Sequence, residues 1–284
     1  ILKFSKLKRN EYHGVVEECM ILANICAANF LLKRKIPTIF RFHEKPDLSK
    51  ITNLKEFLTS RGFKKNMKTS NFRNAILSWL KESKKTRFEE IINIQILRSM
   101  KLAKYDSANS DHFALALDRY CHFTSPIRRY ADLIVHRQLH ALLGWDSDEN
   151  IKLNLLNYNQ ISAHISSTER KSIKAERQTH SRYLASFMIK YINQSFEATI
   201  YSVTRNKVFF FLKENHIQGE CVFEEFNHHT RRKLKRKKEI KKLNISLSTG
   251  DTISVKLIST NTFNGNLFFE YEQLLKRFMV DKKL

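Results

Sequence analysis

The sequence predicts an α+β chain with more than one domain, in which a mostly helical part is followed by a small five-stranded β-barrel. Apolar residues recur at helical spacing over most of residues 11–190. Beyond residue 193 the chain changes to five short runs rich in β-branched and aromatic residues, separated by polar turns. Strands at this spacing are typical of a small barrel. We therefore predict a helical domain over 1–192, a barrel over 193–275 and a basic tail over 276–284.

Proline, glycine and cap residues divide the helical part. Pro37 ends the first long helix, because proline lacks an amide hydrogen and clashes with the preceding turn. Thr124 and Ser125 are possible N-cap residues before Pro126 at a first helical position, and Gly144 marks the end of that helix. The predicted helices span residues 11–35, 48–61, 71–84, 87–104, 126–143 and 151–190, and a loop with a short strand spans 105–120.

The charge of the chain predicts a polyanionic partner. Lysine and arginine number 51 against 28 acidic residues, so the formal net charge is +23. Nucleic acid is the first partner that such an excess indicates. A membrane surface is also anionic, but no apolar run approaches 18 residues and no leader precedes a cleavage site. We expect a cytoplasmic protein without a membrane partner. Because residue 1 is Ile, we also expect the sequence to begin inside a longer protein.

The four cysteines predict neither disulfides nor a zinc site. Cys19, Cys26, Cys121 and Cys221 are widely spaced and form no Cys-x-x-Cys pair. We expect them to be reduced, small and buried.

The sharpest local pattern is the segment from Thr124 to Tyr130, which contains two adjacent arginines. In the predicted helix they lie in the first turn, where the helix dipole disfavours positive charge. A nearby anion would resolve this conflict, and a phosphate can accept from helix N–H groups and from a guanidinium together. The alternative is that Arg128 and Arg129 pair with acidic residues or point to solvent, and the spacing alone does not decide between the two.

The residues around this motif resemble the catalytic (RNB) domain of the RNase II/RNase R family. The segment YCHFTSPIRRYADL at 120–133, continuing to His136 and Arg137, is similar to the family signature. Four further segments also resemble family segments, in family order, and together they cover nearly all of residues 10–190: VVEECMILANICAA at 15–28, PTIFRFHEKPD at 37–47, LRSMKLAKY at 97–105 and HFALALDRY at 112–120. The agreement is more like RNase R than RNase II.

The resemblance implies Mg²⁺-assisted hydrolysis of single-stranded RNA from its 3′ end, which releases nucleoside 5′-monophosphates. Arg128 matches the arginine that holds the scissile phosphate, with Arg129 as a further RNA contact. Glu176 matches a glutamate that contacts the terminal nucleotide, and Glu17 one that reads ribose hydroxyls. We expect a monomer without a preference for DNA.

Each of these residues also has a plain structural interpretation. Glu169 and Glu176 lie seven apart on one helical face, a spacing that solvated ion pairs share. Glu17 and Glu18 lie on an apolar helix, so at least one is expected to be half-buried in a salt bridge. Packing or hydrogen-bonding roles are expected for His122 and His136, and structural roles for Tyr105 and Asp132.

The carboxylate cluster that Mg²⁺ requires is not visible in the sequence. In the family, four aspartates near the start of the catalytic domain bind the metal, and they precede the part that this chain resembles. No metal ligand is predicted in this chain, and the Mg²⁺ ligands are expected upstream of residue 1. The chain alone is therefore expected not to cleave RNA. The alternatives are a catalytically inactive RNA-binding or regulatory protein and, less well supported, a basic ribosome-associated barrel protein.

The stretch 195–273 resembles an S-one-type RNA-binding module, which is an OB-fold barrel. Strand alternation places Phe209 and Phe211 on one face and Phe210 on the other, so one face is core and the other could stack bases. Alternatively, all three rings are core or interface residues.

Nine of the twelve residues from 231 to 242 are basic. Beside the barrel they would attract the phosphate backbone, although a solvated or disordered charge run is the competing interpretation. The predicted RNA contacts here are Arg231, Arg232, Lys233, Lys235, Arg236, Lys237 and Lys238.

Overall fold

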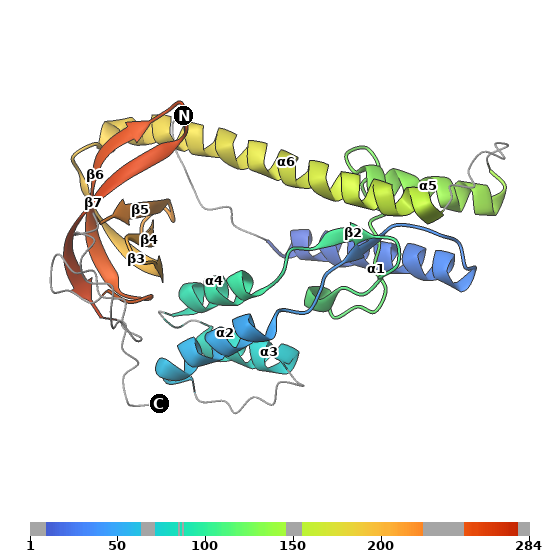
Figure 1. The fold of residues 1–284 in the computed structure, drawn as a ribbon, viewed down its shortest axis with the longest axis horizontal. Helices are drawn as coiled ribbons and strands as arrows, with labels where there is room; N and C mark the ends of the chain where they lie inside the picture. The colour runs from blue at the N-terminus through green and yellow to red at the C-terminus, as the bar shows by residue number, and fades with distance from the viewer. Residues whose placement is uncertain are drawn as a thin grey trace, which may run out of the picture. The chain divides into compact units, whose positions relative to one another are not determined.

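The computed structural model describes residues 10–63, 72–84, 86, 88–145, 155–223 and 247–277 (Figure 1). The chain forms two compact units. We call Leu7–Asp47 with Met100–Ala175 the motif unit, because it contains residues 120–133. We call Leu48–Ser99 with Glu176–Leu284 the barrel unit, because it contains the predicted strands. Each unit is described by itself, and helix α6 (Leu155–Met188) contributes to both.

The motif unit is built from helices around a two-stranded antiparallel ribbon. Its elements are α1 (Glu11–Lys33), β1 (Phe40–Phe42), β2 (Lys104–Asp106), a 3-10 turn (Phe113–Leu115), α5 (Tyr130–Leu143) and the first part of α6. β1 pairs with β2 so that Arg41 lies opposite Tyr105. Ala28 and Leu31 of α1 pack with Val135 of α5 in one core cluster. The unit thus holds the loop before α5 between α1, β1 and α5.

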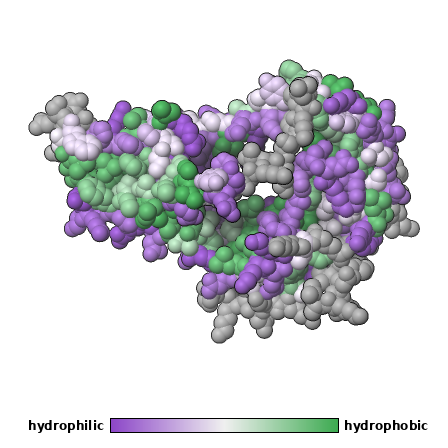
Figure 2. Space-filling view, turned by 180° about the vertical axis from the view of Figure 1, so that it is seen from behind, coloured by the Kyte–Doolittle hydropathy of each residue, from purple (hydrophilic) through white to green (hydrophobic). Residues whose placement is uncertain are grey.

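Helix α1 is buried along only part of its length. Its buried residues begin at Asn24, whereas Tyr12, Val15, Val16 and Leu22 are exposed. Figure 2 shows hydrophobic residues gathered on the surface of the motif unit. By length and composition α1 could cross a membrane, although buried core helices pass the same test. The sequence contains no unbroken apolar run of 18 residues, and α1 passes on its average hydropathy instead.

The described part of the barrel unit contains three whole helices, the last part of α6, a 3-10 turn (Ile189–Tyr191) and a closed five-stranded barrel. The whole helices are α2 (Leu48–Ser60), α3 (Phe72–Ser83) and α4 (Glu89–Ser99), and the strands are β3 (Ser195–Val203), β4 (Lys207–Leu212), β5 (Gln218–Val222), β6 (Thr252–Asn261) and β7 (Asn266–Lys276). The order β3-β4-β5-β7-β6 closes through the β3–β6 pairing. The five predicted strands are confirmed. Phe210 is fully buried inside, and a Cβ on Gly219 would lie 2.7 Å from its ring, which explains why glycine stands there.

Helix α4 packs against the outer side of β3. The Gln95 side chain donates to the carbonyl of Tyr201 at 2.6 Å, and the Arg98 guanidinium lies 5.6 Å from the Tyr201 ring centroid. Tyr201 in turn stacks with Phe211, which is only 5% exposed, while Phe209 is half-buried. In this arrangement Phe211 is a packing residue rather than an open stacking surface, because neighbouring side chains already cover its ring.

Two helix boundaries differ from the prediction. α4 ends at Ser99 rather than near 104, because Lys104 enters β2 and pairs with β1. α5 begins at Tyr130 rather than Pro126, because Arg129 has an extended backbone with φ −124°. Arg129 is the N-cap residue, and the buried Thr124 hydroxyl makes no hydrogen bond to the helix. The two arginines therefore precede the helix and do not lie in its first turn.

The cysteines are free, and two of them are exposed. Cys121 and Cys221 are buried as expected, and burial raises the pKa of each thiol to about 12. Cys19 and Cys26 are exposed on α1, so the expectation that all four are buried is wrong. Both lie on the face of α1 that the described residues leave uncovered.

Candidate phosphate-binding loop

Asn24 of α1 anchors the start of the loop that carries the two arginines. Its side chain donates to the Tyr120 hydroxyl at 3.0 Å and accepts from the Phe123 amide at 2.8 Å. Its carbonyl accepts from the Cys121 thiol at 3.4 Å. Because Asn24 is buried, these bonds are shielded from water and hold residues 120–123 firmly against α1.

Asp132 anchors the other end of the same loop. Its fully buried carboxylate accepts from Nε and from one terminal nitrogen of Arg129, at 2.8 and 2.7 Å. It also accepts from the amide of Ser125 at 2.7 Å. A bidentate guanidinium–carboxylate pair has a defined geometry, and here it is largely excluded from solvent. Arg129 is therefore committed to a protein partner, and Asp132 has the structural role expected for it.

Arg128, one residue earlier, points outward. It is exposed, and among the described residues no ion pair or side-chain hydrogen bond engages its guanidinium. Its neighbour Ile127 is fully exposed and Tyr130 is 48% exposed. The Arg128 amide donates to the Ser125 carbonyl at 3.3 Å, which keeps the turn closed. The fold therefore holds Arg129 in an ion pair and leaves the neighbouring Arg128 exposed to solvent.

Behind the loop lies a buried network of rings. The Tyr105 hydroxyl lies 3.0 Å from Nδ1 of His122. Burial, reinforced by Arg129 and Arg41, lowers the pKa of His122 to about 3. Burial beside His43 lowers the pKa of His112 to about 4. Both imidazoles are therefore neutral at physiological pH, and His122 acts as a hydrogen-bonding residue.

Arg41 joins three parts of the motif unit. Its guanidinium donates to Glu169 of α6 at 2.7 Å and lies over the Tyr105 ring at 4.7 Å from the centroid. Its amide donates to the Tyr120 carbonyl at 2.9 Å. Glu169 is thus an ion-pair partner of Arg41 on β1 and not a solvated charge. The seven-residue spacing of the glutamates in the sequence did not reveal this pair.

The remaining predicted contacts are dispersed. Glu17 is exposed on α1, two turns before Asn24 and so on the same side of the helix. Glu18 is exposed as well, so the expected half-burial of one of this pair is wrong. Glu176 is exposed on α6 and falls in the barrel unit, whereas Arg128 lies in the motif unit. The basic residues from Arg231 to Lys238 lie outside the described residues.

The described residues do not provide a donor set that fits Mg²⁺. Within them, no group of three or more His, Cys, Asp or Glu side chains could hold a metal ion. Two of the aspartates near the motif already have protein partners: Asp132 binds Arg129, and Asp106 accepts from the amides of Ala108 and Asn109 at 2.8 and 2.9 Å. The geometry therefore supports a phosphate contact and no step that passes through a metal.

Comparison with known proteins identifies the family. A family model described as the RNB domain matches residues 1–144, about half of the chain. Ribonuclease R of Buchnera aphidicola subsp. Schizaphis graminum is 35% identical over 268 residues, which cover 92% of this chain and 36% of the relative. The chain belongs to the RNB family, and it spans about a third of the length of this curated relative.

Solved structures show the same fold. Mycoplasma genitalium RNase R, in complex with ribose-methylated single-stranded RNA, matches with a TM-score of 0.81 at 25% identity, over 94% of this chain and 42% of that one. Yeast Ssd1, described as a pseudonuclease, matches with a TM-score of 0.62 at 22% identity, over 76% of this chain and 27% of that one, which shows the fold alone.

Sequence reasoning missed the residues that shape the loop from behind. Asn24 and Arg41 make the decisive contacts, yet neither was singled out. Asn24 carried a signal, since it is a polar residue within the apolar run from Met20 to Ala28. Arg41 carried none, because its partner Glu169 is 128 residues away along the chain.

Proposed function

We propose that this chain is the RNA-holding part of an RNase R-like enzyme that hydrolyses single-stranded RNA from its 3′ end to nucleoside 5′-monophosphates. The observation that carries the proposal is the outward-pointing Arg128, presented on a loop whose two ends are pinned by Asn24 and Asp132. A guanidinium without a protein partner is suited to bind the scissile phosphate and to stabilise the negative charge that develops there.

The other contacts complete the proposal. Glu176 contacts the terminal nucleotide, and Glu17 reads ribose hydroxyls. The barrel is an OB-fold module of the S-one type, in support of which it is closed, five-stranded and linked to a basic run. Of its rings Phe209 is the better base contact, because Phe211 is covered. The protein is cytoplasmic and monomeric, and Mg²⁺ is bound by carboxylates that precede residue 1.

The purified chain is expected to bind single-stranded RNA without cleaving it, because it has the phosphate contact but no described carboxylate cluster. Fluorescence anisotropy with a 5′-labelled oligoribonucleotide measures binding, and gel analysis after incubation with Mg²⁺ measures cleavage. A free 3′ end should bind more tightly than a blocked one. Magnesium-dependent shortening of the RNA by the chain alone would overturn the expectation, and absence of binding would overturn the proposed function.

Replacing Arg128 by alanine is expected to weaken RNA binding by about tenfold, the usual effect of removing a charge-assisted hydrogen bond. The slope of log affinity against log salt should fall by about 0.7, because one phosphate of the strand is no longer neutralised. Lysine should restore part of the affinity, because it keeps the charge but not the planar fork. Arg137, exposed on α5, is the matched control, and its alanine variant should bind like the unaltered chain.

A catalytically inactive RNB-like protein is the second candidate function. It is favoured by the lack of a metal-binding set among the described residues and by a fold that also matches a pseudonuclease. Reading the coding sequence that precedes Ile1 distinguishes the two functions, because only the enzyme requires clustered aspartates there. A cluster there followed by magnesium-dependent activity of the longer protein would exclude the inactive alternative.

A further inference from the structure

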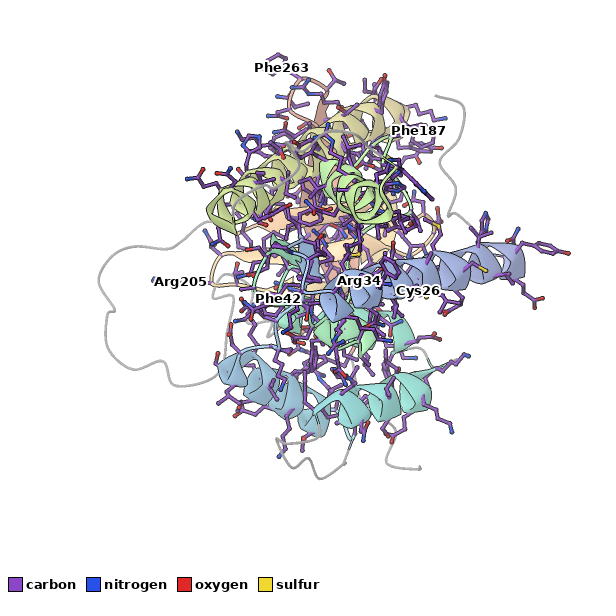
Figure 3. The ribbon with its side chains drawn as sticks, turned by 90° about the vertical axis from the view of Figure 1, so that its right-hand side faces the viewer. Cys26, Arg34, Phe42, Phe187, Arg205 and Phe263 are labelled. Atoms are coloured by element: carbon purple, nitrogen blue, oxygen red, sulfur yellow. The ribbon has the colours of Figure 1, made fainter. Side chains whose placement is uncertain are left out.

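The barrel presents one aromatic side chain almost entirely to solvent. Phe263, in the turn between β6 and β7, is 82% exposed, and Figure 3 shows it pointing away from the protein. The aromatic side of β3 and β4, where base stacking was expected, is instead partly covered by α4. An exposed phenylalanine is not unusual in itself, so its surroundings decide whether it has a role.

The turn that carries Phe263 is held rigidly. The Asn261 side chain accepts from the amides of Phe263 and Asn264 at 3.0 and 3.2 Å, and its carbonyl accepts from the Gly265 amide at 2.8 Å. The Asn264 side chain accepts from the Asn266 amide at 3.0 Å. Three side-chain bonds and one backbone bond therefore fix a segment of six residues, so the ring is presented by a preorganised turn.

The turn is also seated on helix α6. Gly265 has φ +79°, and a Cβ at this position would lie 2.6 Å from Cβ of Ser181 and 2.9 Å from the Arg182 amide. Both the backbone conformation and the close approach require glycine. This contact places the Phe263 ring 5.6 Å from the Arg182 guanidinium, which is itself exposed. Among the described residues the ring and the guanidinium contact each other, and no ion pair or side-chain hydrogen bond engages the guanidinium.

We propose that Phe263 and Arg182 form a stacking site for one base of a single-stranded nucleic acid. The base lies on the open face of the ring, and the guanidinium contacts a phosphate next to it, as aromatic and basic side chains combine in proteins that bind single strands. This inference rests on the proposed RNA binding. We favour nucleic acid over a protein ligand because the ring is paired with a cation in a chain of charge +23.

The test uses the whole chain and two probes, a labelled oligouridylate and a strand of the same length whose central nucleotides are abasic. Phe263→Ala should weaken binding of the oligouridylate by about 5- to 150-fold, the range expected for one stacked base. It should leave binding of the abasic strand unchanged. Phe263→Tyr should keep the affinity, because it keeps the π face. Arg182→Gln should lower the salt slope by about 0.7 with either strand.

Tyr12, an aromatic residue 80% exposed on α1, gives the control variant Tyr12→Ala, which should bind like the unaltered chain. If the unaltered chain binds neither strand, the proposed function fails before this site is tested. If it binds oligouridylate and Phe263→Ala binds equally well, only the stacking site is wrong. If Phe263→Ala weakens binding of both strands equally, the stacking site is also wrong, because the loss then does not depend on the presence of a base. Preferential capture of a protein in place of RNA would do the same.

Discussion

Replacing Asp132 by alanine is expected to lower the free energy of unfolding of the motif unit by about 3–5 kcal/mol, the usual result of removing one partner from a buried ion pair. The fully buried carboxylate accepts two bonds from Arg129 and one from the Ser125 amide. Alanine leaves a guanidinium that is only 18% exposed without its carboxylate and a backbone N–H without an acceptor. Hydrogen exchange of amides across residues 120–143 measures the change.

Two variants make this result interpretable. Asp118 is exposed, and no side-chain bond engages it among the described residues, so Asp118→Ala should change stability by no more than about 0.5 kcal/mol. Asp132→Asn keeps the shape and one acceptor oxygen, so its effect should fall between the two. If Asp132→Ala is as stable as Asp118→Ala, the bonds from Asp132 to Arg129 and to the Ser125 amide do not hold the loop. RNA affinity should decrease in the same order, from Asp118→Ala through Asp132→Asn to Asp132→Ala, because the bonds of Asp132 fix the backbone that carries Arg128.

Acidification is expected to destabilise the motif unit well before its carboxylates protonate. The pKa values of His122 and His112 are lowered by burial to about 3 and about 4, whereas an unfolded histidine titrates near about 6.5. Between these values the unfolded state binds more protons, so stability is fully present above about pH 6.5 and falls as pH decreases. Each histidine loses about 1.4 kcal/mol per pH unit once the pH is well below about 6.5 and less than that near pH 6.5, so the pair loses about 3 kcal/mol between about pH 6.5 and 5.

Urea unfolding followed by circular dichroism at both pH values measures this loss. His122→Gln removes one titrating group while keeping an acceptor for the Tyr105 hydroxyl, so the variant should lose about half as much stability on acidification. His164, exposed on α6, gives the control variant His164→Gln, which should keep the steep profile of the unaltered chain. A flat profile in the unaltered chain would show that these imidazoles are not held neutral by burial.

The phosphate loop and the barrel turn share one construction. In each, side-chain bonds fix a short non-helical segment, and the side chain of the exposed residue at its tip takes no part in those bonds. Asn24 and Asp132 fix the loop that carries Arg128, while Asn261 and Gly265 fix the turn that carries Phe263. A rigid segment loses little conformational entropy when it binds, so each tip is suited to contact a ligand.

The sequence by itself determined the element types, because they depend on local periodicity. Helical spacing located α1, α2 and α3 to within two residues, and runs rich in β-branched and aromatic residues located all five strands. The motif at 120–133 also indicated the family, since it is contiguous along the chain and needs no knowledge of the fold. The start of α5 was misplaced, because a proline after two hydroxyl residues is equally compatible with the turn that forms there.

Only the tertiary structure decided which of the similar side chains are available to a ligand. Arg128 and Arg129 are adjacent and alike in sequence, but the buried Asp132 carboxylate binds only Arg129 and leaves Arg128 exposed. Phe211 and Phe263 are equally aromatic, yet one lies against Tyr201 beneath α4, and the other stands on a turn seated on α6. Burial and pairing arise from contacts between residues that are distant along the chain, as Gln95 and Tyr201 are at 106 positions apart. Local patterns cannot encode such contacts, so the availability of a side chain had to come from the fold.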